Sequence, residues 1–422
     1  MQALGAMDRI QLQQLADDLS RRYAEFQARR LNLDMTRGKP CAEQLALSNG
    51  LLEIADYRAA DGTDCRNYGG LEGLPEARAL FAELLEADVE EVLVGGNSSL
   101  AMMHDTIVQA LLRPLPGASE PWRGTAPVRF LCPSPGYDRH FAICQYLGIE
   151  MIPVAINEEG PDMGEVERLA GGDSSIKGIW CVPKYSNPTG VTFADSVVER
   201  LATMPTAAAD FRVFWDNAYA VHHLTGAPDR LANLMAACKR AGNDDRVFVF
   251  VSTSKISFAG AGVAAMASSA ANLRWLKQGL SLQTIGPDKL NQLRHVRFFK
   301  DGEGIAAQMR RHAEILKPKF DRVEQVLAAE LGERGSARWT KPRGGYFVSL
   351  DTCDGCAGEV VAMAAAAGVK LTAAGATFPG GKDPRDRNIR IAPSMPSLSE
   401  IGVAMELLAI CVQRVAIRKL LD

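Results

Sequence analysis

Four short apolar runs in the middle of the chain place the strongest constraint on its fold. They cover residues 128–132, 178–182, 212–215 and 246–251 and are rich in β-branched and aromatic residues. Apolar runs without polar alternation are typical of strands in a parallel sheet that helices cover on both faces. Helix-like segments or polar loops separate the runs. The central part of the sequence therefore predicts an α/β architecture with a mainly parallel sheet.

The C-terminal third follows a different pattern. A long helical stretch over residues 305–331 precedes short strands around 346–350 and further helix. This pattern predicts a smaller α+β domain, which the N-terminal helix is expected to join. A chain of 422 residues is long enough for two domains. We predict a large α/β domain over residues 49–294 and a small domain formed by residues 1–48 together with 295–422.

Composition excludes several classes of function. A formal net charge of −3 gives no reason to expect nucleic acid or an anionic membrane as a partner. No apolar run approaches the roughly 20 residues that a membrane span needs. Nine cysteines without an export signal indicate a reducing cytoplasm. Cys353 and Cys356 form one CxxC motif, but no second Cys or His pair lies nearby, so we expect no metal site.

Polar residues follow each of the four apolar runs. Asp216 ends the third run, Lys255 follows the fourth, and Tyr137 and Asn187 follow the other two. Ligands of open parallel sheets bind beyond the carboxyl ends of the strands, so these side chains are expected to meet at one edge. Ser98 is placed to cap a helix, and the free backbone N–H groups of such a helix end are suited to bind phosphate. The pattern therefore predicts a ligand site at that edge.

The motifs are similar, in order and spacing, to those of class I/II aminotransferases of fold type I, which depend on pyridoxal 5'-phosphate (PLP). The resemblance extends from Thr36 to Arg390. It rests on the segments Asn187–Gly190, Asp216–Tyr219, Ser252–Lys255, Tyr68–Pro75, Pro135–Tyr137, Gly344–Phe347 and Asn388–Ser394. The strings Thr-Arg-Gly-Lys-Pro, Pro-Gly-Tyr-Asp-Arg-His-Phe and Thr-Ser-Lys-Ile-Ser-Phe-Ala-Gly-Ala-Gly resemble, more narrowly, the type Ic aspartate aminotransferases.

The resemblance implies a role for each residue near the cofactor ring. Lys255 would hold the cofactor as an imine and later shuttle the α-proton of the substrate. Asp216 would keep the ring nitrogen protonated, and the ring withdraws electrons only in that state. Tyr219 and Asn187 would hydrogen-bond the ring oxygen, and Tyr137 would stack on the ring face. Lys255, Asp216 and Tyr219 are thus the predicted catalytic residues.

The resemblance also implies which residues bind the cofactor's phosphate. These residues are Ser98, Ser99, Leu100, Ser252 and Tyr68. In the family the tyrosine that matches Tyr68 reaches across from the other subunit, which implies a homodimer with shared active sites. The family usually carries an arginine shortly after the lysine, but this chain has Ala261-Gly-Val there. Lys289 or Arg294 could replace that arginine, or backbone donors could suffice.

For the substrate, Arg390 matches the arginine that binds the α-carboxylate as a bidentate pair. Gly38 matches a glycine beside the substrate, where Asn187 is also expected. Arg37 and Lys39, the neighbours of Gly38, are then expected near a second acidic group of the substrate, and so is Arg139. The alternative is that these cations form surface ion pairs with Asp34, Glu72 or Asp138. His222 and His223 could line the site, although buried structural histidines are the simpler interpretation.

We therefore predict a cytoplasmic aminotransferase that uses small-molecule substrates, with aspartate and 2-oxoglutarate as the favoured pair. A PLP-dependent lyase or decarboxylase is the alternative within the fold, because the cofactor residues are largely shared. A regulatory ligand-binding module is a third hypothesis. Such proteins need a winged helix upstream of the fold, and the resemblance begins by Thr36, so we do not favour it.

Overall fold

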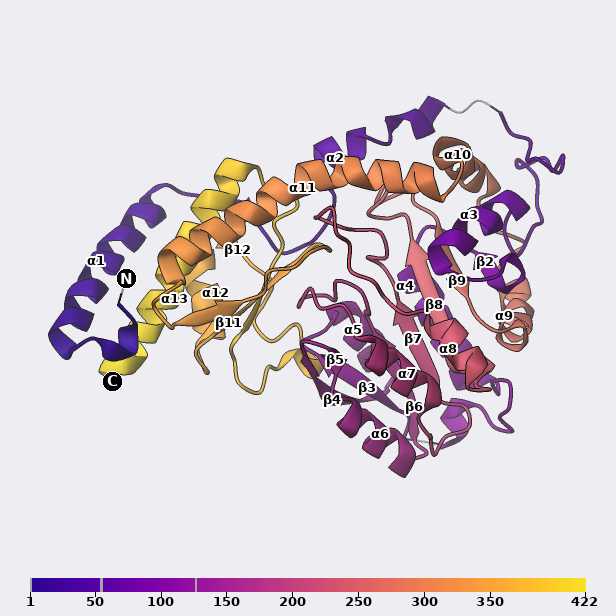
Figure 1. Cartoon of the computed structure of the whole chain (residues 1–422), viewed down its shortest axis with the longest axis horizontal. Coiled ribbons are helices and arrows are strands. Elements are labelled where there is room, and N and C mark those ends of the chain that lie inside the picture. Colours follow the sequence, from indigo (N-terminus) through magenta and orange to yellow (C-terminus); the bar gives the residue numbers. More distant parts are fainter. Residues whose placement is uncertain (1, 54–55, 126) are drawn as a thin grey trace.

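A mostly parallel sheet forms the centre of the larger part of the molecule (Figure 1). The computed structural model describes residues 2–53, 56–125 and 127–422, and within them eight strands form this sheet. Their spatial order is β2 (Val92–Val94), β9 (Ala264–Ala267), β8 (Val247–Ser252), β7 (Arg212–Asp216), β6 (Ile176–Cys181), β3 (Arg129–Ser134), β4 (Glu150–Asn157) and β5 (Gly160–Pro161). The strands from β8 to β4 run parallel, and β9, β2 and β5 pair antiparallel. The four predicted runs are β3, β6, β7 and β8.

Helices cover both faces of this sheet, as the apolar runs predict. They are α3 (Pro75–Leu85), α4 (Ser99–Leu112), α5 (Asp138–Tyr146), α6 (Met163–Gly172), α7 (Asp195–Thr203), α8 (Leu234–Arg240), α9 (Ala270–Gln283) and α10 (Lys289–Phe299). Successive strand side chains point to opposite faces. Phe214 and Phe248 therefore pack with α4, α5 and α9, whereas Val213 and Val249 pack with α3, α6, α7 and α8. Both faces of the sheet are buried.

A second core lies between the N-terminal and C-terminal segments. It contains α1 (Arg9–Ala28), α2 (Ala42–Ala46), α11 (Gly302–Leu331), α12 (Ala357–Ala366), α13 (Leu398–Leu421), the sheet β10 (Ala337–Trp339), β11 (Val348–Thr352), β13 (Asn388–Ile391), and the pair β1 (Leu33–Asp34) with β12 (Val369–Lys370). The helices α1, α11 and α13 lie side by side in Figure 1 and share one apolar cluster. The N-terminal helix thus packs against the C-terminal helices.

The long helix α11 connects the two parts of the molecule. Asp301 caps it by accepting a hydrogen bond from Gly304 N, and the helix then runs from beside α10 to beside α13 (Figure 1). The proposed domain boundary between residues 294 and 295 falls inside α10. The division into 49–294 and the two flanking segments stays a prediction.

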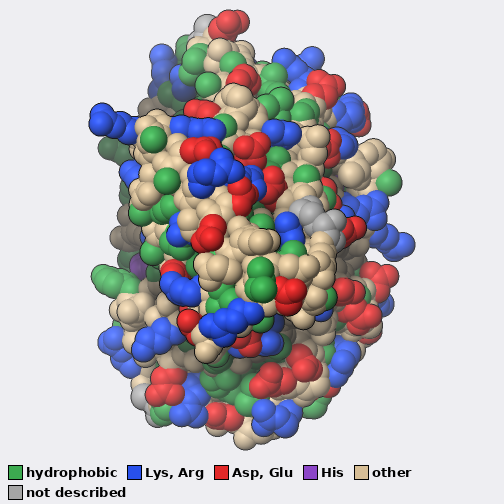
Figure 2. Space-filling model, turned by 90° about the vertical axis from the view of Figure 1, so that its left-hand side faces the viewer, with side chains coloured by type: hydrophobic (Ala, Val, Ile, Leu, Met, Phe, Trp, Pro, Cys, Tyr) green, Lys and Arg blue, Asp and Glu red, His purple; other side chains and the backbone are tan. Residues whose placement is uncertain are grey.

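The surface has mixed charge on the face drawn in Figure 2. Lys and Arg side chains are interspersed with Asp and Glu side chains there, over the side of the molecule that carries α1 and α13. No single sign gathers on this face, in agreement with the small net charge of −3. Within the described residues, no helix is long and apolar enough to cross a membrane.

Candidate active site

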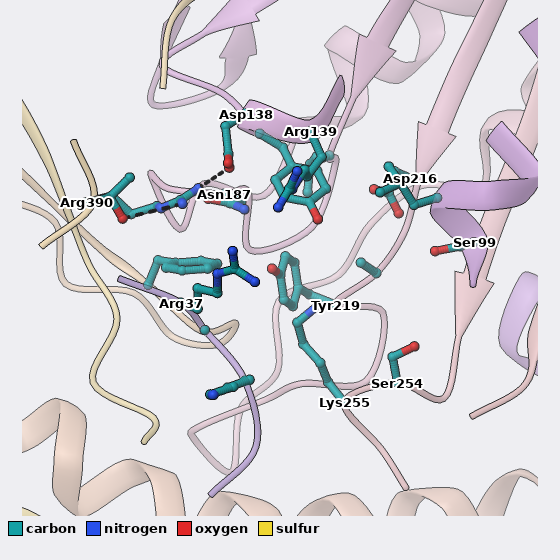
Figure 3. Close-up of a pocket in the computed structure, with 18 of the residues that line it drawn as sticks. Arg37, Ser99, Asp138, Arg139, Asn187, Asp216, Tyr219, Ser254, Lys255 and Arg390 are labelled. Atoms are coloured by element: carbon teal, nitrogen blue, oxygen red, sulfur yellow. Dashed lines mark hydrogen bonds and ion pairs between the residues drawn. The ribbon is translucent and has the colours of Figure 1, made fainter. Parts of the chain in front are cut away.

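A cavity of about 680 Å³ lies at the carboxyl ends of the parallel strands, where Figure 3 shows it. The predicted residues that line it are Arg37, Gly38, Lys39, Ser98, Ser99, Leu100, Tyr137, Arg139, Asn187, Asp216, Tyr219, Ser252, Lys255 and Arg390. The sheet order explains this convergence, since β8, β7, β6 and β3 are consecutive neighbours and end at one edge. Tyr68 does not line the cavity of its own chain, and its side chain is 85% exposed.

Lys255 lies just after β8 on an aromatic surface. Its Nζ is 5.0 Å from the centre of the Tyr219 ring and 5.9 Å from that of the Tyr346 ring. Burial lowers the pKa of Lys255, and the nearby Asp216 carboxylate opposes that change. No hydrogen bond or ion pair holds its amine among the described residues. A lysine with a lowered pKa is closer to the neutral form in which an amine acts as a nucleophile or base.

Asp216, the last residue of β7, is 2% exposed and has one satisfied oxygen. Its Oδ2 lies 3.0 Å from His140 Nε2, so the imidazole donates its Nε2 proton to the carboxylate. The other oxygen, Oδ1, is buried and has no hydrogen-bond partner among the described residues. A buried carboxylate oxygen without a donor is costly, which indicates that a ligand group supplies one.

Sequence reasoning missed His140. It lies in the first turn of α5 and stacks on Trp180, with ring centroids 4.2 Å apart and planes 7° apart. Trp180 Nε1 in turn donates to Cys144 Sγ. The available signal was the spacing of Tyr137 and His140, because a residue three positions after a cavity residue, in the first turn of a helix, faces the same side. Its contact with Asp216 depends on the sheet order and had no local signal.

The phenols of Tyr137 and Tyr219 stay protonated at ordinary pH. Burial, with smaller contributions from nearby acidic groups, raises the pKa of Tyr137 to about 12. Burial also raises the pKa of Tyr219 well above its usual value. Both side chains therefore remain hydrogen-bond donors. Asn187, 2% exposed, completes this part of the wall, and its Oδ1 accepts from Arg390 Nη1 at 3.3 Å.

One corner of the cavity presents hydroxyls and a helix N-terminus. Ser98 caps α4 by accepting from Ala101 N at 3.2 Å, as the sequence predicted, and Ser99 and Leu100 open the helix. Ser252 Oγ donates to Ser254 Oγ at 3.2 Å. Ser254 lines the cavity and was missed, although it stands between Ser252 and Lys255 in the motif. These donors suit an anion such as a phosphate.

The suggested replacements for the missing arginine are wrong within this chain, because neither residue lines the cavity. The ammonium of Lys289 is buried, and its Nζ donates to the carbonyl oxygens of Asn67 and Gly69 at 2.7 Å each. Arg294 lies on the same helix, α10. Hydroxyls and backbone N–H groups are therefore the anion donors of this corner that the chain itself supplies.

Arg390 forms the opposite wall. It lies in β13, is 6% exposed, and its guanidinium sits over the Phe347 ring at 4.9 Å. Its Nη1 donates to Asp138 Oδ1 at 2.7 Å, and Figure 3 marks this contact. Gly38 approaches the same ring so closely that an added Cβ would lie 2.6 Å from Phe347 Cζ. Only glycine therefore fits at position 38 without a shift.

The three further cations of the cavity have no ion-pair partner within 4.0 Å in the described part of the chain. They are Arg37, Lys39 and Arg139. Their expected surface partners are engaged elsewhere: Glu72 pairs with Lys277 and Arg78, Asp138 pairs with Arg390, and Asp34 accepts hydrogen bonds from Thr36. The ion-pair alternative from the sequence is thus wrong. Figure 3 shows Arg37 and Arg139 directed toward the cavity from different segments.

The sequence of the chain matches the model of one protein family over nearly its whole length. The model described as aspartate amino-transferase matches residues 7–422. The chain belongs to the aspartate aminotransferase family. Its architecture is fold type I of the PLP-dependent enzymes, and it is an aminotransferase.

Relatives within the family match nearly the full length of the chain. A putative aminotransferase of Mycolicibacterium smegmatis is 52% identical, with 100% of this chain and 99% of that protein covered. The aspartate aminotransferase of Corynebacterium glutamicum is 47% identical over 94% and 92% of the two chains. The crystal structure of an aspartate transaminase from that organism has a TM-score of 0.96 at 45% identity, with 99% of both chains covered. None of these relatives favours a lyase or a regulatory module.

His222 and His223, which the sequence suggested as possible site residues, do not line the cavity. Burial lowers the pKa of His222 well below its usual value, and the neutral ring packs edge-on against Tyr219 and Tyr346. His223 accepts or donates a hydrogen bond with Tyr185 at 2.8 Å. No cluster of metal-binding side chains exists among the described residues, and Cys353 and Cys356 are free thiols.

Proposed function

We propose that this aminotransferase uses PLP and moves the amino group of aspartate, or of another dicarboxylic amino acid, to a 2-oxo acid such as 2-oxoglutarate. The observation that carries the proposal is the meeting of two groups in one cavity. Among the described residues, the amine of Lys255 has no hydrogen-bond or ion-pair partner, and the buried Oδ1 of Asp216 has no donor. In PLP, a protonated ring nitrogen would supply the donor that Asp216 Oδ1 lacks, and Lys255 would be the residue that holds the cofactor through its amine.

The residues of the cavity fit PLP at each of its functional groups. Ser98, Ser99, Leu100, Ser252 and Ser254 would hold the phosphate. Tyr219 and Asn187 would hydrogen-bond the ring oxygen, and Tyr137 would cover the ring face. When bound, PLP withdraws electrons from the substrate's α-carbon, provided that its ring nitrogen stays protonated. The hydrogen bond from His140 fixes the orientation of the Asp216 carboxylate for this task.

The chain's own residues account for binding, orientation and proton movement. Arg390 binds the substrate's α-carboxylate, which fixes the orientation of the α-carbon. The amine of Lys255, which lines the cavity, would take the proton from the substrate's α-carbon and hold it beside the reacting atoms. Its lowered pKa favours the neutral form that this role needs. The buried phenol of Tyr219, whose ring centre lies 5.0 Å from Lys255 Nζ, would donate a hydrogen bond to the ring oxygen of the cofactor beside that amine.

The charge of the cavity supports a dicarboxylic substrate. Among the described lining residues, Arg37, Lys39, Arg139 and Arg390 are cationic in addition to the amine of Lys255, and Asp138 and Asp216 are acidic. Like charges that face one cavity repel one another unless an anion enters. The phosphate and the α-carboxylate account for part of that excess. Arg37, Lys39 and Arg139 remain for a distal carboxylate, and we include all three as candidates.

We further propose a cytoplasmic homodimer with shared active sites. Tyr68, which the family resemblance assigns to the phosphate of the other subunit, is 85% exposed in its own chain. Leu282 and Ile285 are also exposed, by 90% and 62%, which suits an interface between copies. All nine cysteines are free thiols, as expected in a reducing compartment.

Absorbance of the purified protein with its cofactor tests the proposal. The bound cofactor's spectrum should change when aspartate is added without an oxo acid, and it should return when 2-oxoglutarate follows. This reversible pair of half-reactions separates an aminotransferase from a lyase or decarboxylase, which would release a cleaved product instead. No spectral change with aspartate or glutamate, but a full cycle with alanine, would refute the dicarboxylic substrate and leave the aminotransferase assignment intact.

A further inference from the structure

The ion pair between Arg390 and Asp138 joins the two parts of the molecule across the cavity. Arg390 belongs to β13 of the small sheet, and Asp138 is the first residue of α5, which covers the large sheet. The distance from Arg390 Nη1 to Asp138 Oδ1 is 2.7 Å, and Figure 3 shows the pair at the wall. A carboxylate of the protein thus contacts the cation that the proposed function assigns to the substrate's carboxylate.

This contact leaves part of the guanidinium unsatisfied. Asp138 uses one oxygen on one nitrogen, whereas Nη2 has Thr372 Oγ1 at 3.5 Å and Nε has no partner among the described residues. Arginine and carboxylate pair most strongly when two parallel hydrogen bonds form. An incoming carboxylate with two free oxygens therefore gains more at Arg390 than Asp138 does.

Asp138 has a favourable alternative position. Its side chain is 32% exposed, compared with 6% for Arg390, so water reaches the acid but hardly the base. Asp138 also lies in the first turn of α5, whose N-cap residue Tyr137 makes no side-chain cap. A carboxylate is stabilised at such a helix N-terminus. Release of Asp138 from Arg390 thus strands no buried charge, provided that another carboxylate takes its place.

We propose that Asp138 is a specificity-determining residue: its carboxylate occupies Arg390 in the empty enzyme and is exchanged for the carboxylate of the substrate. The inference rests on the proposed function, and it adds that Asp138 competes with the substrate's carboxylate for Arg390. Because the arginine is already neutralised, an amine or amide without a carboxylate gains nothing from Arg390. An Arg390 that is free in about a tenth of the molecules would bind its ligand about ten-fold more weakly than its intrinsic affinity allows.

Calorimetric binding of succinate, an unreactive dicarboxylate, to the cofactor-loaded enzyme tests the exchange. Asp138→Asn keeps the shape of the side chain and removes its charge. We expect this variant to bind succinate about three- to ten-fold more tightly than the native enzyme, with a larger rise in Tm on ligand addition. Asp138→Ser, which is well tolerated at a helix start, gives a second measurement if the Asn variant folds poorly. Asp34→Asn is the matched control, since Asp34 lies near Lys39 but does not line the cavity.

The outcomes are distinct. A gain in affinity for Asp138→Asn, with Asp34→Asn unchanged, supports the exchange. Equal or weaker binding by Asp138→Asn would show that Asp138 only positions Arg390, and the exchange would be wrong while the proposed function stands. The same gain in both variants would point to general charge and would also overturn it. No succinate binding by any form of the enzyme would refute the dicarboxylic function itself, and the exchange with it.

Discussion

At the scale of single residues, a comparison of Lys255 with Lys184 distinguishes a lysine with a chemical role from a lysine that is only buried. Burial lowers the pKa of both lysines, but only Lys255 lines the large cavity. We expect Lys255→Ala to abolish turnover and the imine absorbance while the fold, followed by circular dichroism, stays intact. Lys184→Ala is the control and should keep the absorbance. A Lys255→Ala protein with normal turnover would disprove the assignment.

The role of Asp216 is also a residue-scale question, because its two oxygens have different surroundings. We expect Asp216→Asn to lower kcat by several orders of magnitude with a modest loss of cofactor, since the amide no longer holds the proton on the ring nitrogen. Each factor of ten corresponds to about 1.4 kcal/mol of barrier. Steady-state kinetics and cofactor titration measure the two effects. Near-normal kcat would mean that another group protonates the ring.

At the scale of elements, the N-terminus of α4 combines capping with proposed phosphate binding. Ser98→Ala removes the cap to Ala101 N and should cost about 1 kcal/mol in free energy of unfolding. Ser397→Ala removes the cap of α13 and should cost a similar amount. We expect only Ser98→Ala to weaken cofactor binding, measured by equilibrium dialysis. Equal cofactor affinity in both variants would contradict a phosphate site at this helix end.

The strands of the large sheet differ in how well their sequences predict them. Strands β3, β6, β7 and β8 were predictable, because β-branched and aromatic residues fill them. Strand β9 reads Ala-Ala-Met-Ala, a composition without strand preference, so only its pairing between β2 and β8 makes it a strand. The strand ends predicted that Tyr137, Asn187, Asp216 and Lys255 meet at one edge, whereas Arg37, Gly38, Lys39 and Arg390 were expected only from the family resemblance.

Three features of the site had no local signal. The contacts of His140 with Asp216 and of Arg390 with Asp138 join residues 76 and 252 positions apart, so the tertiary fold alone creates them. Arg37, Lys39 and Arg139 have no ion-pair partner in the described part of the chain, and this likewise depends on where distant acids lie. Charge positions along a sequence do not reveal which pairs form, because long side chains choose among several neighbours.

At the scale of the whole molecule, mixed dimers test whether Tyr68 serves the other subunit. Lys255→Ala and Tyr68→Ala each damage one component of the proposed shared site. In a mixed dimer, one site would combine the intact Lys255 of one chain with the intact Tyr68 of its partner. We therefore expect mixing the two variants, after reversible dissociation, to restore activity. No recovery, with confirmed mixed dimers, would place Tyr68 outside the partner's site.

The substrate preference also belongs to this scale, because segments from both parts of the molecule contribute the cations of the cavity. We expect aspartate and glutamate to exceed alanine and leucine in kcat/KM by orders of magnitude, because a distal carboxylate left unpaired costs several kcal/mol. Arg37→Ala, Lys39→Ala and Arg139→Ala are compared one at a time, and loss of the preference identifies the cation. Lys370→Ala, outside the cavity, is the control. Equal rates for all four amino acids would refute dicarboxylate specificity.

The burial of the thiols makes the cysteines natural reporters of local opening. Cys353 is partly exposed, whereas the other eight cysteines are buried. An alkylating reagent therefore reaches each enclosed sulfhydryl only when its surroundings open. Labelling of Cys132 and Cys181 would report opening of the large sheet, and labelling of Cys411 would report loosening of the packing around α13. Labelling rates, site by site, would thus record which core loosens first, without any introduced probe.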